Sequence, residues 1–220
     1  MTGPGLTVDC LPGIIPVFPL PEVLLLPRGR LPLNIFEPRY LAMVDDALAE
    51  HRLIGMIQPC LADRRVATPA LYGTGCAGRI ADLEETDDGR YLIALIGVCR
   101  FRVAEELPRK DGYRRVRADW SDYTGDLCPC EDARLDRTRL LAALRRYFDS
   151  QGINADWDAV ESAPDERLVT CLAMICPFGA SEKQALLEAP DVPTRADMLT
   201  TLVEMAAHGG KPSCGGPSCQ

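Results

Sequence analysis

The first apolar runs of the chain are interrupted by prolines, and this feature limits the fold more than any other. One run covers residues 15–21 and the other residues 31–40. Proline fixes its own φ and lacks the N–H that helices and central strands need, so both runs are predicted to be short, kinked strands. Pro38 is suited to the first turn of a helix, where no N–H is needed, and one helix is expected between residues 37 and 53.

The sequence up to residue 121 is otherwise typical of β structure. Residues 53–57 form a continuous apolar run, which indicates a strand buried on both faces. The glycine-dense segment 72–80 predicts a bulged or bent strand where backbones approach closely. A hairpin is expected around Gly89, since Asp-Gly supplies the positive φ of a tight turn. Alternating strands are expected near residues 98–103 and 113–120.

The chain changes character after residue 121, where an acidic connector leads into helical patterns. Apolar residues recur at helical spacing from Leu140 to Phe148 and again from Leu168 to Cys176, before Pro177. Capping boxes that start at Ser162, Ser181 and Thr194 predict three helix starts. Short amphipathic helices must bury their apolar faces against one another or against the β part.

These patterns predict an α+β fold with a division into five parts. They are a flexible lead (1–12), a β barrel with one inserted helix (13–121), an acidic linker (122–132), a helical bundle (133–207) and a flexible Gly/Pro/Cys tail (208–220). With 220 residues the chain can bury about 70% of its unfolded surface.

Several motifs recur in an order that is specific to one family. The chain has P-x-F-P-L at 16–20, I-F-E-P-R-Y at 35–40, G-C-A-G-R-I at 75–80, and P-F followed by S-E-K-Q-A-L-L-E at 181–188. From residue 13 to 207 it resembles the N-terminal, substrate-binding domain of bacterial Lon proteases, in a free-standing form without the ATPase and peptidase domains. The resemblance implies a PUA-like, partly closed β barrel followed by a small helical bundle.

The same resemblance implies a non-catalytic, polypeptide-binding protein linked to proteolysis or protein quality control. Its partners would be unfolded or exposed polypeptide segments, and a protease or chaperone. A segment could add to an open barrel edge or lie in an apolar groove between barrel and bundle. The sequence does not choose between these modes and does not identify the binding residues. Single copies are expected to bind isolated peptides weakly, because they lack the effective concentration of a hexamer.

No catalytic residue or cofactor is expected. The only Gly-Lys pair, at Gly210, precedes Pro212 and lacks the spacing of a phosphate-binding ATPase loop. The two histidines, His51 and His208, have no neighbouring pattern that suggests a nucleophile and base. The most recognisable residues, Phe36 and Tyr40, are interpreted as structural, because together they would staple the start of the helix.

An RNA-associated PUA-like module is the first alternative. Residues 100–117 hold seven basic residues against three acidic ones, and Arg114, Arg115 and Arg117 are the candidate contacts. The net charge of −8 opposes phosphate binding, so nucleic acid is the weaker interpretation. Salt separates the two functions, since added salt weakens RNA binding and not apolar peptide capture.

A zinc-binding or thiol-redox protein is the second alternative. Cys128 and Cys130 could join Cys214 and Cys219 as four thiolate ligands, although their spacing is unlike that of common zinc sites. Most of the ten cysteines are expected to be reduced, with Cys60, Cys76 and Cys99 as core residues. No run is long enough to cross a bilayer and no signal peptide is evident, so a cytoplasmic protein that does not contact membranes is expected.

Overall fold

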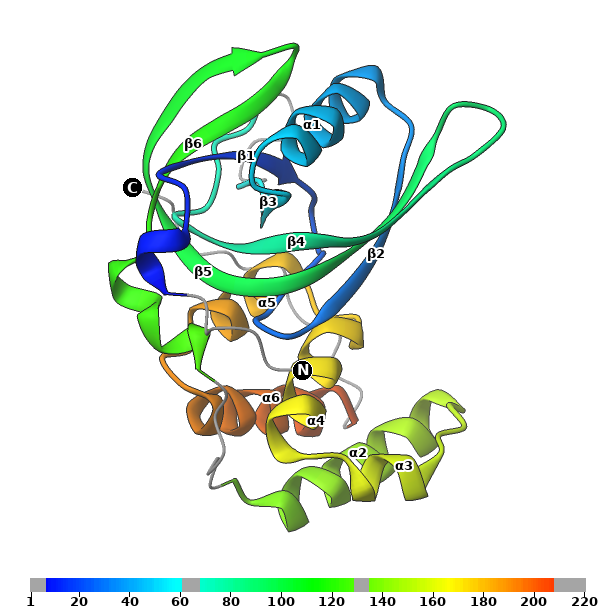
Figure 1. Ribbon diagram of the computed structural model, residues 1–220. Helices are drawn as coiled ribbons and strands as arrows, with labels where there is room; N and C mark the ends of the chain where they lie inside the picture. The colour runs from blue at the N-terminus through cyan, green and yellow to red at the C-terminus, as the bar shows by residue number, and fades with distance from the viewer. Residues whose placement is uncertain (1–6, 61–67, 129–134, 208–220) are drawn as a thin grey trace. The chain divides into compact units, whose positions relative to one another are not determined.

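The computed structural model divides the chain into two compact units, Met1–Pro129 and Cys130–Gln220 (Figure 1). The structure describes residues 7–60, 68–128 and 135–207. The first unit contains a six-stranded mixed sheet and one long helix, and the second unit is helical. The predicted α+β class, with helices after a partly closed ring of strands, is confirmed.

Nine elements lie in the described residues of the first unit. They are η1 (Val8–Cys10), β1 (Ile14–Pro19), β2 (Arg30–Ile35), α1 (Pro38–Ala49), β3 (Leu53–Ile57), β4 (Thr74–Glu85), β5 (Tyr91–Lys110), β6 (Tyr113–Asp119) and η2 (Ser121–Leu127). Pro38 opens α1, as predicted. The predicted strand at 98–103 is part of the long strand β5, whose earlier half pairs with β4 across the expected turn at Gly89, where φ is +77°.

The strands form a ring with one strand outside it. The sheet order is β2-β5-β4-β3-β1-β6, and β5 also pairs with β6, which closes a ring of five strands (Figure 1). β1 changes partner along its length, pairing with β6 at residues 14–17 and with β3 at residues 17–19. β2 is the strand outside the ring. It pairs with the first half of β5 and lies at one end of the sheet order.

The interior of the ring depends on close approaches at glycine. Phe101 is fully buried, and a Cβ at Gly75 would lie 2.6 Å from its ring and 2.7 Å from the Met56 carbonyl oxygen. β4 changes register between Ala77 and Gly78, so the predicted irregular, glycine-dense strand is confirmed. The predicted core thiols are buried as well.

The segment after β6 differs from the expected linker. Residues 121–127 form the 3₁₀ helix η2, which belongs to the first unit. Its Asp126 accepts hydrogen bonds from the backbone N–H and the guanidinium of Arg100, at 3.0 and 2.8 Å. The acidic composition that predicted a linker from residue 122 therefore includes a carboxylate that the fold buries.

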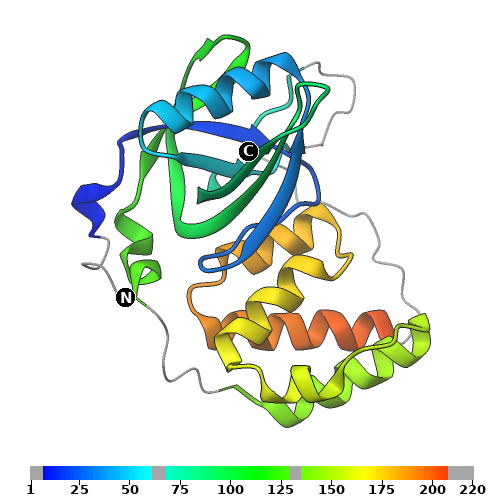
Figure 2. The same ribbon diagram turned by 45° about the vertical axis from the view of Figure 1, so that its right-hand side comes forward.

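The second unit contains five helices in the described residues. They are α2 (Arg137–Gln151), α3 (Trp157–Ser162), α4 (Asp165–Ile175), α5 (Ala180–Glu188) and α6 (Val192–Ala207). α6 packs against α2, α4 and α5 (Figure 2). Leu140, Leu144 and Phe148 are buried as their spacing predicts, but Ile175 is 70% exposed. Within the described ranges, no helix has the length and hydropathy of a membrane span.

The three predicted capping boxes are wrong. Ser162 ends α3 and does not start a helix. α5 begins after Gly179, whose N–H donates to the Glu182 carboxylate at 2.8 Å. At α6, the carboxylate of Asp191 accepts from the N–H of Thr194 at 2.7 Å, so Asp191 caps the helix in place of Thr194.

Candidate functional site

An apolar groove lies beside the start of α1. It encloses about 420 Å³, within the range of ligand sites in proteins. Its wall combines the end of β1 and the loop after it, the strand β2 and the first turn of α1. We call this the apolar groove. Its lining residues are Phe18, Pro19, Leu20, Val23, Leu31, Pro32, Leu33, Asn34, Phe36, Glu37, Arg39 and Tyr40.

The strand beside this groove has an edge that no strand of the described residues pairs with. The carbonyl of Gly29 accepts from the N–H of Gly97, and Arg30 lies opposite Ile96, so odd-numbered residues of β2 bond toward β5. The backbone groups of Arg30, Pro32 and Asn34 therefore point away from β5. Pro32 fits this outer side, because it has no N–H to leave unpaired.

The expected staple between Phe36 and Tyr40 is wrong. Phe36 is 62% exposed and lines the groove. Tyr40 packs instead on Phe18, with ring centroids 4.3 Å apart. Phe36 immediately follows the last residue of β2, so its side chain is at the rim and not in the core. The half-buried Leu31 and Leu33 were also missed, although their alternation along a proline-bearing edge strand was visible in the sequence.

A second hollow shares a wall with the groove and is lined by three arginines. It encloses about 160 Å³ and includes Pro19, Arg39 and Tyr40, which also line the groove. Arg109 and Arg114, from the two strands of the β5–β6 hairpin, complete the cationic side. We call this the arginine pocket. Its three guanidiniums lie beside the apolar groove, and Arg39 lines both hollows.

Tyr40 separates the two hollows and keeps its proton. Burial raises the pKa of its phenol, against the opposing effect of Arg39, while Glu37 raises it further and Arg114 and Arg109 lower it. The Arg39 guanidinium lies over the ring, 4.5 Å from its centroid. The hydroxyl is consequently a hydrogen-bond donor at neutral pH.

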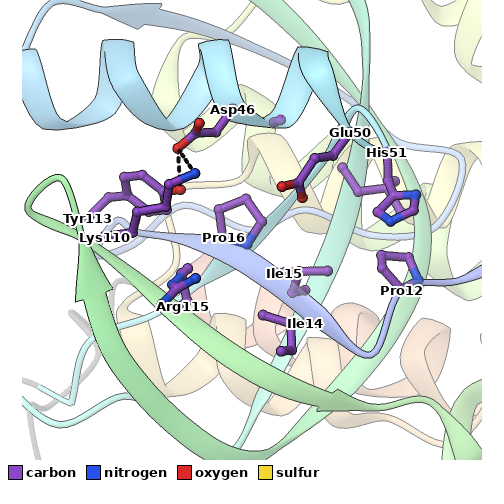
Figure 3. Close-up of a pocket in the computed structure, with 12 residues that line it drawn as sticks. Pro12, Ile14, Ile15, Pro16, Asp46, Glu50, His51, Lys110, Tyr113 and Arg115 are labelled. Carbon is purple, nitrogen blue, oxygen red and sulfur yellow. Dashed lines mark hydrogen bonds and ion pairs between the residues drawn. The ribbon is translucent and has the colours of Figure 1, made fainter.

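A third hollow, at the other end of α1, contains an ion pair and a hydrogen bond that both involve Asp46 (Figure 3). Asp46 accepts from the Tyr113 hydroxyl at 2.6 Å and pairs with the Lys110 ammonium at 2.9 Å. The hydrogen bond from Tyr113, followed by that from Lys110, lowers the pKa of Asp46. Burial, followed by the bond to Asp46, raises the pKa of Tyr113. These groups bind the hairpin to α1.

The candidate RNA contacts do not form a free basic surface. Arg114 donates both sides of its guanidinium to Glu106, at 2.7 and 2.6 Å. Arg117 pairs with Glu105 at 3.3 Å, and Arg115 donates to the carbonyl of Pro108. Arg100, Arg102 and Lys110 pair with Asp126, Asp122 and Asp46. These carboxylates lie outside residues 100–117, so the positive excess counted there is largely neutralised in the folded first unit.

The predicted metal ligands are mostly outside the described residues. Cys128 is exposed at the end of η2, whereas Cys130, Cys214 and Cys219 fall in segments that the structure does not describe. Where residues are described, no three His, Cys, Asp or Glu side chains gather into a metal site. His51 follows α1 and lines the third hollow, and His208 lies beyond the described chain.

The curated relatives of this chain are Lon proteases. It is 31% identical over 208 residues to Lon protease 2 of Myxococcus xanthus, covering 92% of this chain and 25% of that protein. It is 28% identical over 200 residues to Lon protease of Parabacteroides distasonis, covering 84% and 23%. The chain thus spans about a quarter of the length of these relatives.

Two solved structures have the same fold. A Lon N-terminal domain protein from Xanthomonas campestris is 24% identical with a TM-score of 0.60, over 86% of this chain and 97% of that one. The N-terminal domain of Mycobacterium avium complex Lon protease is 16% identical with a TM-score of 0.57, over the same shares. The model of the ATP-dependent protease La (LON) substrate-binding domain matches residues 14–205, whereas no peptidase or ATPase domain is matched. This chain therefore belongs to the family of Lon substrate-binding domains.

Proposed function

We propose that the first unit binds extended, apolar segments of unfolded or exposed polypeptides, in the service of proteolysis and without chemistry of its own. The family is one of substrate-binding domains, and its relatives are proteases. The observation that carries the proposal is the edge of β2 that no described strand pairs with, beside an apolar groove of about 420 Å³. Together these features offer both backbone and side-chain recognition.

The edge and the groove can act on one ligand. A strand added to β2 would bond to the outward groups of Arg30 and Asn34, because their N–H groups point away from β5. Directly opposed residues on neighbouring strands place their side chains on the same face of a sheet. Alternate side chains of the added strand would therefore contact Leu31 and Leu33, on the groove side.

The remaining parts of the proposal concern the cellular compartment, the partner and the affinity of binding. The described cysteines are free thiols, which suits the reducing cytoplasm. A protease or chaperone would be the partner that acts on the bound segment. We expect affinity in the micromolar range or weaker for a single peptide, since one six-residue edge strand gives few contacts and a monomer has no multivalent gain.

A peptide titration tests the binding site. The probe is a fluorescent, unstructured twelve-residue peptide with a central apolar run, titrated with the whole chain and read by anisotropy. Leu33→Asp is expected to weaken binding more than about tenfold, because a carboxylate in an apolar groove loses its hydration. Leu83→Asp is the matched control, since Leu83 is 42% exposed on β4 and does not line the groove.

The titration has clear contrary outcomes. Equal loss in both variants would point to a general charge effect and not to the groove. Unchanged binding by Leu33→Asp would place the peptide elsewhere. Thermal unfolding of each variant, matching that of the parent chain, shows that the change lies in binding.

A further inference from the structure

The charges around the arginine pocket do not cancel. Arg114 is neutralised by Glu106, and Arg39 pairs with Glu37 at 2.7 Å. Arg109 is exposed and donates to the Thr68 hydroxyl at 2.7 Å, but no carboxylate of the described residues pairs with it. Among the described residues, the three guanidiniums and their two carboxylates leave a formal charge of +1 beside the apolar groove.

We propose that the arginine pocket is a subsite for the carboxylate of an aspartate or glutamate side chain in the bound polypeptide. The preferred segments would then combine an apolar run with an adjacent acidic residue. This inference rests on the proposed polypeptide binding and adds the class of segment that is favoured. It assigns Arg109 as the principal contact, with Arg39 and the Tyr40 hydroxyl beside it.

The dimensions and charge of the pocket fit this ligand. Its volume of about 160 Å³ is less than half that of the groove, which suits a side-chain end and not a second apolar run. A guanidinium binds a carboxylate through two parallel N–H bonds. A single excess positive charge matches one carboxylate, while Glu37 and Glu106 disfavour a more highly charged phosphate.

The location of the pocket favours a side chain over a chain end. Outward backbone groups of β2 lie at Arg30 and Asn34, on both sides of Pro32, so a bound strand can follow the whole edge. Tyr40 and Pro19 form the shared wall between groove and pocket. An acidic residue that flanks the apolar run can cross this wall while the strand continues.

Paired peptides test the subsite. Two C-terminally amidated peptides share one apolar run and carry either glutamate or glutamine next to it, with the acidic residue placed before the run in one set and after it in another. The whole chain is expected to bind the better glutamate peptide about fivefold more tightly than its glutamine partner. The preference should shrink as salt rises from about 0.05 M to about 0.5 M.

Variants assign the preference to the pocket. Arg109→Gln should bind both peptides with the affinity that the parent chain has for the glutamine peptide. Arg39→Gln should reduce the preference for the glutamate peptide. Arg117→Gln is the control, because it removes the same charge from β6 outside both hollows and should keep the preference. Loss of the preference in Arg117→Gln as well would overturn the proposal in favour of a general charge effect.

The other outcomes separate this proposal from the proposed function. Equal affinity for glutamate and glutamine peptides would overturn the subsite and leave polypeptide binding intact. No binding of either peptide would overturn both. A further peptide is the glutamine form with a free C-terminal carboxylate. If only this peptide binds more tightly than the amidated glutamine form, the pocket binds a chain end, and the side-chain proposal is overturned.

Discussion

The two ends of the β5–β6 pair both carry arginines, but the structure uses them differently. At the end near η2, the side chain of Arg100 is 4% exposed and is bound to Asp126. At the turn end, Arg109 is exposed and pairs with no carboxylate in the described part of the chain. The same residue type closes the barrel at one end and faces a hollow at the other.

This difference shows why a count of basic residues misleads. The run from residue 100 to 117 has a positive excess in the sequence, but pairing with Asp126, Asp122 and Asp46, which lie outside the run, consumes most of it. The positive charge that remains at Arg109 lies in the arginine pocket, beside the apolar groove. Such a surface suits a mixed polypeptide segment better than a uniformly charged polymer.

The buried end should show the largest effect on stability. Asp126→Ala removes the carboxylate that pairs with the buried Arg100 guanidinium, and we expect a loss of about 3–5 kcal/mol in the free energy of unfolding. Urea-induced unfolding measures it. Asp122→Ala is the control, because the Arg102–Asp122 pair is more than half exposed and should cost less than about 1 kcal/mol. Equal losses would remove the contrast between a buried pair and an exposed one.

The apolar groove, which adjoins the arginine pocket, should affect binding and not stability. Phe36→Ala removes a ring that is 62% exposed, so the free energy of unfolding should change by less than about 0.5 kcal/mol. Affinity for an apolar peptide should fall about fivefold, as expected when an aromatic anchor of moderate strength is removed. Anisotropy titration measures the change. A large loss of stability with unchanged affinity would return Phe36 to the structural role that its sequence context indicated.

Local patterns predicted the fold well because their causes are local. The turn at Gly89 needs a positive φ, and Pro38 suits a first helical turn, so neighbouring residues decide both features. The spacing from Leu140 to Phe148 likewise fixes one buried helix face. The family motifs then extended these local predictions to the whole architecture.

The candidate site was less visible, because it depends on partners far apart in the chain. The role of Asp126 is set by Arg100, 26 residues away, and composition alone marked that segment as a linker. The arginine pocket joins α1 to the β5–β6 hairpin, which no sequence period relates. The capping boxes failed because Ser162 and Thr194 match a degenerate pattern: Ser162 ends α3, and the carboxylate of Asp191 caps α6.

The bond between the hairpin and α1 should give a small dependence of stability on pH. The folded pKa of Asp46 is lowered by Tyr113, then by Lys110, so its stabilisation is present above the unfolded value of about 4 and is lost as the pH falls through the folded value. Asp46→Asn should cost less than about 1 kcal/mol at pH 7, and its difference from the parent chain should shrink below about pH 4. Urea unfolding across this range measures it, with the exposed Asp87→Asn as control. A difference that stays constant with pH would contradict the ionic origin.

The smallest effect that we expect is the binding of nucleic acid. Its measurement tests directly whether the arginines of the β5–β6 pair are free to bind phosphate. Because Arg114 and Arg117 are paired with Glu106 and Glu105, few phosphate contacts are available, and a single-stranded RNA should bind with a Kd weaker than about 10⁻⁴ M at ~0.15 M salt. Anisotropy with a labelled, unstructured RNA measures this, and Glu105→Gln is the informative variant, since it frees Arg117 and should raise affinity slightly. Tight binding by the parent chain that falls steeply with salt would show that these pairs open for phosphate. In that case the turn end would be a nucleic-acid surface, and the acidic-residue subsite would lose its argument from charge.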